Sequence, residues 1–179
     1  MSIKRPLLSL LFLLLVGTLP AVATELPMQQ HHHAGHMHGG PDDRKLVMFP
    51  PEMITQQLKN MRDHMEALDG ILRALAADDY AGAAAIANTR LGLDSPSAVG
   101  CKPLPQGAPR PAKGSMEEMM GLYMPEDMRA LGVAMHSAAS DFATAALEAK
   151  GKADPKIAYQ ALSQVTAHCT ACHAAFRVH

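Results

Sequence analysis

The sequence predicts an all-α protein, in the form of an antiparallel four-helix bundle, and three observations support this class. Every regular segment repeats its apolar residues at steps of three and four, the period of a helix, and none alternates with period two. Aromatic residues make up only 4% of the chain and Trp is absent, whereas strands favour aromatic and β-branched residues. Alanine-rich segments recur along the chain, and alanine is the strongest helix former.

The first 23 residues contain the three parts of an export signal. The basic pair Lys4-Arg5 precedes an apolar run over 7–16, and Ala21-Val22-Ala23 forms a small-residue cleavage motif. We therefore expect a signal peptide over 1–23 and a mature, periplasmic protein that starts at Thr24. The apolar run is too short to span a bilayer comfortably, so we expect no membrane insertion.

Residues 24–49 predict a disordered leader, because a tract dominated by His, Gly and Pro cannot build a core. Its neutral imidazoles could bind copper, nickel or zinc loosely, through five histidines within eight residues: His31, His32, His33, His36 and His38. The alternatives are a solvated tail whose metal affinity is incidental and a remnant of an expression tag.

The bundle itself is expected over 50–179. The periodicity predicts a first helix over 52–77 and a second over 81–91, which Gly92 closes. The apolar face expected to turn inward on the first helix consists of Ile54, Leu58, Met61, Met65, Leu68, Leu72 and Leu75.

Residues 93–114 hold five prolines and predict a long loop. This loop contains Cys101, the odd cysteine of the chain, for which a free thiol and an intermolecular bridge both remain open. Ser115 and Glu118 then resemble a capping box that starts a brief helical turn.

Two further helices complete the bundle. Pro125 opens the third, which stops at Gly151, and Asp154-Pro155 starts the fourth. The fourth helix is expected to turn a set of residues inward that includes two cysteines: Ala158, Leu162, Val165, Cys169, Cys172 and Phe176.

The fourth helix ends in Cys169-Thr170-Ala171-Cys172-His173, the C-x-x-C-H signature of covalent haem c attachment. Thiols three residues apart lie on one helical face, so both can form thioethers with one porphyrin, and His173 becomes the proximal iron ligand. A thioredoxin-like motif would need a nearby βαβ pattern, and a zinc site would need a second cysteine pair. A structural disulfide would not explain His173.

Four helices with this signature near the carboxyl end resemble the class II c-type cytochromes, the cytochrome c′ family. The resemblance covers 51–178 and includes Phe176-Arg177, where the family tends to have an aromatic residue followed by arginine. It implies one haem c on the last helix, redox partner proteins, and a homodimer through the first two helices. The histidine-rich leader and the proline-rich loop depart from the family's compact form.

The resemblance also implies that a residue of the first helix lies on the distal side of the iron. Met61 is the expected distal ligand, with Met65 and His64 as alternatives and an open site as a further one. His64 is one step off the apolar face and is expected at the rim. Arg177, four residues after His173, can neutralise a haem propionate, as can Arg62.

Together these observations predict a periplasmic electron-transfer protein, not an enzyme, with His173 and Met61 bound to the iron. Two other functions stay open. One is a five-coordinate protein that binds NO or CO, and the other is a metal carrier or sensor that works through its histidine-rich leader. The formal net charge is −1, so no basic field favours nucleic acid.

Overall fold

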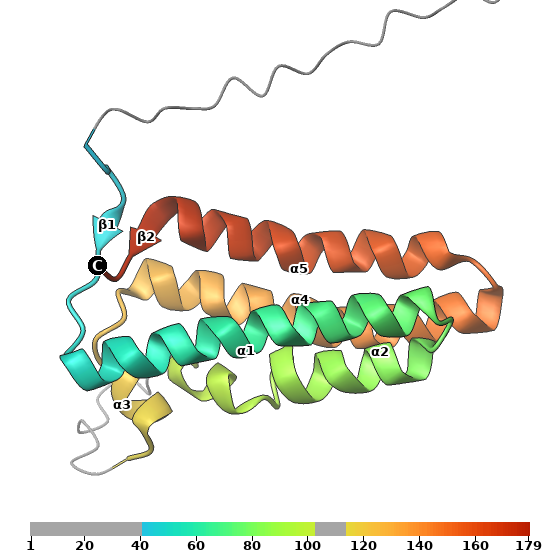
Figure 1. Ribbon diagram of the computed structural model, residues 1–179, viewed down its shortest axis with the longest axis horizontal. Coiled ribbons are helices and arrows are strands. Elements are labelled where there is room, and N and C mark those ends of the chain that lie inside the picture. The colour runs from blue at the N-terminus through green and yellow to red at the C-terminus, as the bar shows by residue number, and fades with distance from the viewer. Residues whose placement is uncertain (1–40, 103–113) are drawn as a thin grey trace, which may run out of the picture. The chain divides into compact units, whose positions relative to one another are not determined.

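The computed structural model describes residues 41–102 and 114–179, and within these ranges the chain is mostly helical (Figure 1). The expected signal peptide and all five leader histidines lie outside the described residues. None of the described helices is both long and apolar enough to cross a membrane. The elements, in chain order, are β1 (Lys45–Leu46), α1 (Pro51–Ala76), α2 (Tyr80–Ile86), a π-helical segment η1 (Ala87–Leu91), a 3-10 helix η2 (Pro96–Cys101), α3 (Met116–Gly121), α4 (Glu126–Lys152), α5 (Pro155–Ala175) and β2 (Phe176–Arg177).

The helix starts follow the capping signals in the sequence. The side chain of Asp79 accepts a hydrogen bond from the Gly82 amide before α2, and Asp154 accepts one from the Lys156 amide before α5. Ser115 and Glu118 form both hydrogen bonds of the predicted capping box at α3. The all-α class is therefore confirmed for the described residues, with the exception of the β1–β2 pair.

Small side chains let α4 and α5 approach each other closely along their length. Ala139, Ala146 and Ala158 are fully buried, and Phe142 fills the core between them. By contrast, α1 makes few contacts with either α4 or α5, and it packs instead against α2 and η1. This arrangement leaves space between α1 and α5, and the candidate site occupies that space.

The last residues of the expected leader are part of the fold. β1 pairs in parallel with β2, so that Lys45 lies opposite Phe176. Val47 and Phe49 are 3% and 6% exposed, and they pack against Phe176. The disordered leader expected over 24–49 therefore does not extend to its end, because these alternating apolar residues bury their side chains. We call residues 42–49 the strap.

The inward face of α1 is rotated by one residue from the predicted face. The structure buries Met53, Gln57, Asn60, His64, Ala67, Ile71 and Leu75, whereas Met65 is 66% exposed and Leu72 is 51% exposed. The prediction used apolar residues alone and so excluded the three polar residues that turn inward. The expectation that His64 lies at the rim is wrong, since it is only 8% exposed.

The first part of the predicted loop over 93–114, residues 93–102, contains regular structure. It contains η2, and the last residue of η2, Cys101, is only 8% exposed. Burial raises the pKa of the Cys101 thiol to about 11, which keeps it protonated. Cys101 has no disulfide partner among the described residues, and an intermolecular bridge would require its side chain to become exposed.

α4 continues one residue past the predicted stop at Gly151, to Lys152, and its C-cap residue Ala153 has a φ of 52°. This left-handed conformation costs an alanine roughly 1 kcal/mol, while glycine adopts it freely. We therefore expect Ala153→Gly to raise the free energy of unfolding by about 0.5 to 1 kcal/mol in urea denaturation. The matched control is Ala167→Gly in the exposed middle of α5, which should lower it by about 1 kcal/mol. A loss of stability in Ala153→Gly would contradict the strain assigned to this helix end.

Candidate functional site

A cavity of about 150 Å³ lies between α1, α4 and α5, and η2 and α3 contribute to its wall. Its lining is largely apolar, and α5 contributes His168, Cys169, Cys172 and His173 to it. The C-x-x-C-H residues share this position because spacings of three and four residues fall on one helical face. The structure therefore brings the three predicted attachment residues to the edge of a single apolar cavity.

The two cysteines of the motif are half-buried free thiols. Burial raises the pKa of both Cys169 and Cys172, so the thiols stay protonated at neutral pH. His173 is exposed, and its backbone carbonyl accepts a hydrogen bond from Arg44 of the strap at 3.4 Å. The motif thus presents two thiols toward the cavity and one imidazole near the protein surface.

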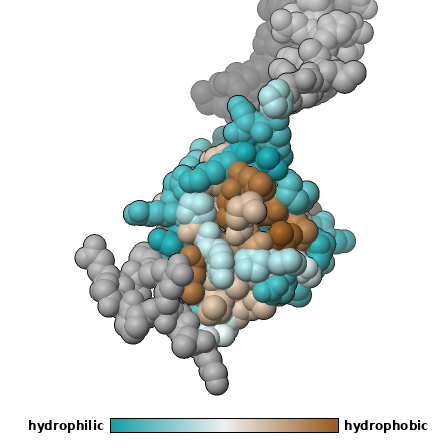
Figure 2. Space-filling model, turned by 90° about the vertical axis from the view of Figure 1, so that its left-hand side faces the viewer, coloured by the Kyte–Doolittle hydropathy of each residue, from teal (hydrophilic) through white to brown (hydrophobic). Residues whose placement is uncertain are grey.

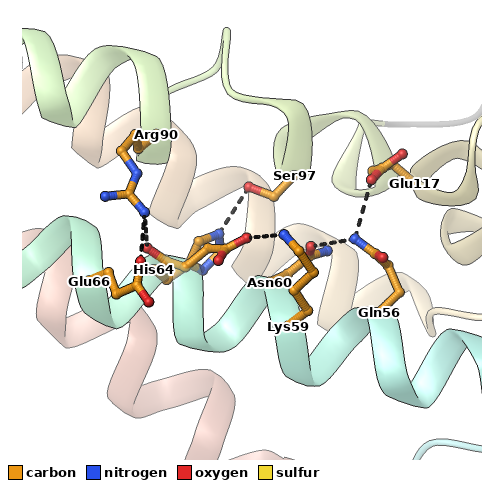
Figure 3. Close-up of polar contacts among 9 residues, drawn as sticks. Gln56, Lys59, Asn60, His64, Glu66, Arg90, Ser97 and Glu117 are labelled. Carbon is orange, nitrogen blue, oxygen red and sulfur yellow. Dashed lines mark hydrogen bonds and ion pairs between the residues drawn. The ribbon is translucent and has the colours of Figure 1, made fainter.

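The three candidates for the distal position all line the same cavity, but they differ in exposure and in hydrogen bonding. Met61 is half-buried, whereas Met65 is mostly exposed. His64 is buried, and its Nε2 lies 2.9 Å from Ser97 Oγ (Figure 3). This hydrogen bond occupies Nε2 only and leaves Nδ1 of His64 as a donor atom, so Met61 and His64 both stay candidates for the distal position.

Polar contacts flank His64 along α1 (Figure 3). Arg90 donates to the Asp63 carbonyl at 3.3 Å and pairs with Glu66, which ties η1 to α1. One turn earlier, Gln56 donates to Asn60 Oδ1 at 2.9 Å. The contacts of α1 with Arg90 and with Ser97 join it to η1 and η2 and favour the rotation that carries Met61 and His64 to the cavity.

A second buried imidazole lies next to His64. The rings of His64 and His136 are 5.8 Å apart and perpendicular, and His136 Nδ1 donates to the Leu91 carbonyl at 2.6 Å. Burial, followed by the nearby His136, lowers the pKa of His64 to about 4. Burial also lowers the pKa of His136. Both imidazoles are therefore neutral at pH 7, and His136 leaves only its Nε2 as a further acceptor.

Several residues of the cavity wall were not among the predicted site residues. The polar ones include Gln57, Asn60, Ser97 and Glu117, and Cys101 adds a buried thiol. Four further methionines, from α3, the turn after it and α4, supply thioether groups: Met120, Met124, Met128 and Met135. Met128 and Met135 are seven residues apart, on one face of α4, whereas Met120 and Met124 come from another segment, so spacing alone could not have grouped all four. Their thioethers make much of the wall soft and adaptable.

The two arginines that the sequence offers as propionate contacts, Arg62 and Arg177, differ in position. Arg62 is exposed and does not line the cavity, whereas Arg177 lines an adjoining hollow of about 190 Å³ together with Cys172 and His173. Arg177 Nε lies 3.6 Å from Asp42 Oδ2 but is buried without a hydrogen-bond acceptor among the described residues. Arg44 lines the same hollow and was not predicted from the sequence.

Within 41–102 and 114–179, no three His, Cys, Asp or Glu side chains converge to hold a metal ion by themselves. A haem iron needs only one or two protein ligands, whereas a structural zinc site needs about four. Comparison with protein-family models, with curated proteins and with solved structures found no match to this chain.

Proposed function

We propose that this chain is a c-type cytochrome of class II, in which α1, α2, α4 and α5 form an antiparallel four-helix bundle. In this proposal Cys169 and Cys172 hold one haem c by thioether bonds, and His173 is the proximal ligand. The observation that carries the proposal is the position of these three residues at the edge of one apolar cavity between α1, α4 and α5.

The cavity fits such a group on three counts. The lining of the cavity is largely apolar, so burial of a flat apolar group against it is favourable. The two thiols lie on one helical face and are free to form thioethers. The orphaned Arg177 Nε supplies a buried donor for a carboxylate at the edge of the site.

More specifically, we propose a low-spin electron carrier with Met61 as the distal ligand. When bound, the haem supplies a one-electron iron couple, and a thioether ligand raises its potential. Met61 is half-buried in the cavity wall, and it lines the adjoining hollow too. The exposed position of His173 supports electron exchange with redox partner proteins at the surface of α5. Periplasmic location is proposed from the signal peptide and from the extracytoplasmic assembly of c-type haem.

Covalent attachment tests the class. Expressed with a c-type maturation system, the mature chain should keep its haem through denaturing electrophoresis, because thioethers survive unfolding. The double variant Cys169→Ala/Cys172→Ala should lose all haem stain, since no thioether can form. Cys101→Ala, which removes the third cysteine, should retain it. Complete release of haem from the wild type in acid acetone would refute the proposal.

A further inference from the structure

Two arginines from opposite ends of the chain meet beside His173. Arg44 comes from the strap and Arg177 from β2, and both line the 190 Å³ hollow next to the haem-attachment residues. Asp42 Oδ2 is shared between them, at 2.7 Å from Arg44 and 3.6 Å from Arg177. This end of the molecule presents apolar surface with a hydrophilic rim where the strap meets the body (Figure 2).

We propose that Arg44 and Arg177 together bind a carboxylate, namely a propionate of the haem that Cys169 and Cys172 attach. The inference rests on the proposed function and extends it, because it makes the strap, which precedes the bundle, a part of the haem site. A guanidinium group suits this role, since its parallel N–H groups match the two oxygens of a carboxylate.

The backbone holds Arg44 in place. β1 pairs with β2 in parallel, and the Val47 amide donates to the Arg177 carbonyl at 2.8 Å. Val47 and Phe49 anchor the strap through their burial. Arg44 also donates to the His173 carbonyl at 3.4 Å, so its guanidinium lies beside the backbone of the proximal residue itself.

The Nε–H group of Arg177 has no acceptor among the described residues. Its Nε is buried and without a hydrogen-bond partner among the described residues, which is unusual for a charged group because an unmet buried donor is costly. The ion pair with Asp42 is too long to be a hydrogen bond. A carboxylate that enters the hollow would satisfy this donor.

The cluster of Arg44, Arg177 and Asp42 carries a net positive charge that one more anion can balance. Asp42 is ionised, because its hydrogen bond with Arg44 lowers its pKa to about 2. Two guanidinium groups therefore face one carboxylate. The described residues that line the hollow include Arg44, Arg177, His173 and His179 and no acidic side chain. A single propionate carries the charge that balances this pair.

The test uses the mature, haem-loaded protein with carbon-13 in the propionate carboxyl groups. Redox-induced infrared difference spectra then show the propionate carboxylate bands by their isotope shift. We expect Arg44→Gln and Arg177→Gln each to shift these bands. The matched control is Arg73→Gln, which removes an exposed arginine of α1 that also pairs with a carboxylate, Asp69, and it should leave them unchanged.

The reduction potential separates a charge effect from a structural one. Loss of a positive charge beside the haem favours the ferric state, so Arg44→Gln and Arg177→Gln should lower the midpoint potential. Asp42→Asn removes a negative charge from the same cluster and should raise it. Arg44→Lys keeps the charge and should stay close to the wild type, which covers the case in which a glutamine variant folds poorly.

Two results would overturn this inference. One is haem-loaded protein whose labelled carboxylate bands are the same in both glutamine variants as in the wild type. The other is a potential that moves in the same direction in Asp42→Asn as in the arginine variants, since that result would mean the strap acts on the fold alone. Absence of covalent haem in the wild type would refute the proposed function, and this inference with it.

Discussion

Met61→Ala should convert the oxidised protein from low-spin to high-spin and remove the weak far-red band that sulfur-to-iron charge transfer produces. The thioether is the proposed sixth ligand, and its loss deletes both a bond and the preference of that bond for ferrous iron. The midpoint potential should fall by on the order of 0.1 V, a fraction of the roughly 0.8 V over which axial ligands set haem potentials. CO should then bind to the reduced variant without first displacing a ligand.

Two further variants serve as controls for this test. Met61→Leu keeps the volume of the side chain and removes only the sulfur, so it should reproduce the spectral change without the cost of a cavity. Met65→Ala alters a neighbouring, mostly exposed methionine of α1 and should leave the spectra unchanged. If instead Met65→Ala or His64→Ala removes the band, the distal ligand is that residue. A wild type that is already high-spin and takes up CO or NO directly would favour gas binding over electron transfer.

Lowering the pH from 7 to 5 should destabilise the protein through its buried imidazoles. In the folded state, burial lowers the pKa of His64 to about 4, whereas an unfolded histidine titrates near 6.5. Between these pH values the unfolded chain binds a proton at His64 and the folded chain does not. The free energy of unfolding is therefore highest above pH 6.5 and falls as the pH approaches 4. The total loss from His64 is about 3 kcal/mol. The lowered pKa of His136 acts in the same direction.

Urea denaturation at several pH values between 7 and 5 measures this effect. His64→Gln should flatten the pH dependence, because the amide does not titrate. If His64→Gln shows the full wild-type slope, the acid sensitivity comes from other groups. Measurements stop at pH 5 because below it carboxylates such as Asp42 and Asp63, whose pKa values are lowered by ion pairs, also contribute.

The helices and their caps were predictable because their signals are local. Pro155 after Asp154 and the Ser115–Glu118 box each act within a few residues, and the structure contains both. The position of the C-x-x-C-H motif on a helical face also follows from spacing alone. Apolar periodicity likewise found the length of α1 to within one residue at each end.

What the sequence could not supply depends on contacts between distant segments. The rotation of α1 is set by polar contacts to η1 and η2, such as that of His64 with Ser97, so an apolar pattern placed the buried face one residue away. The strap is ordered only because β2, far along the chain, offers it a strand to pair with. Cys101 is buried because η2 folds against Gly132, where an added Cβ would lie 2.4 Å from its sulfur.

The pairing of the strap with β2 also has a consequence for the order in which the molecule folds and opens. Arg44 and His173 are 129 positions apart, so their contact closes a loop that spans the whole body of the protein. Closing a flexible loop of that length costs about 4 kcal/mol of chain entropy. Only the pairing of β1 with β2 and the burial of two apolar side chains, Val47 and Phe49, offset this cost. Such long-range contacts form late and open first. Amide hydrogen exchange should therefore be faster at Val47 than in the middle of α4, and the motif cysteines should become accessible through this opening before the helices separate.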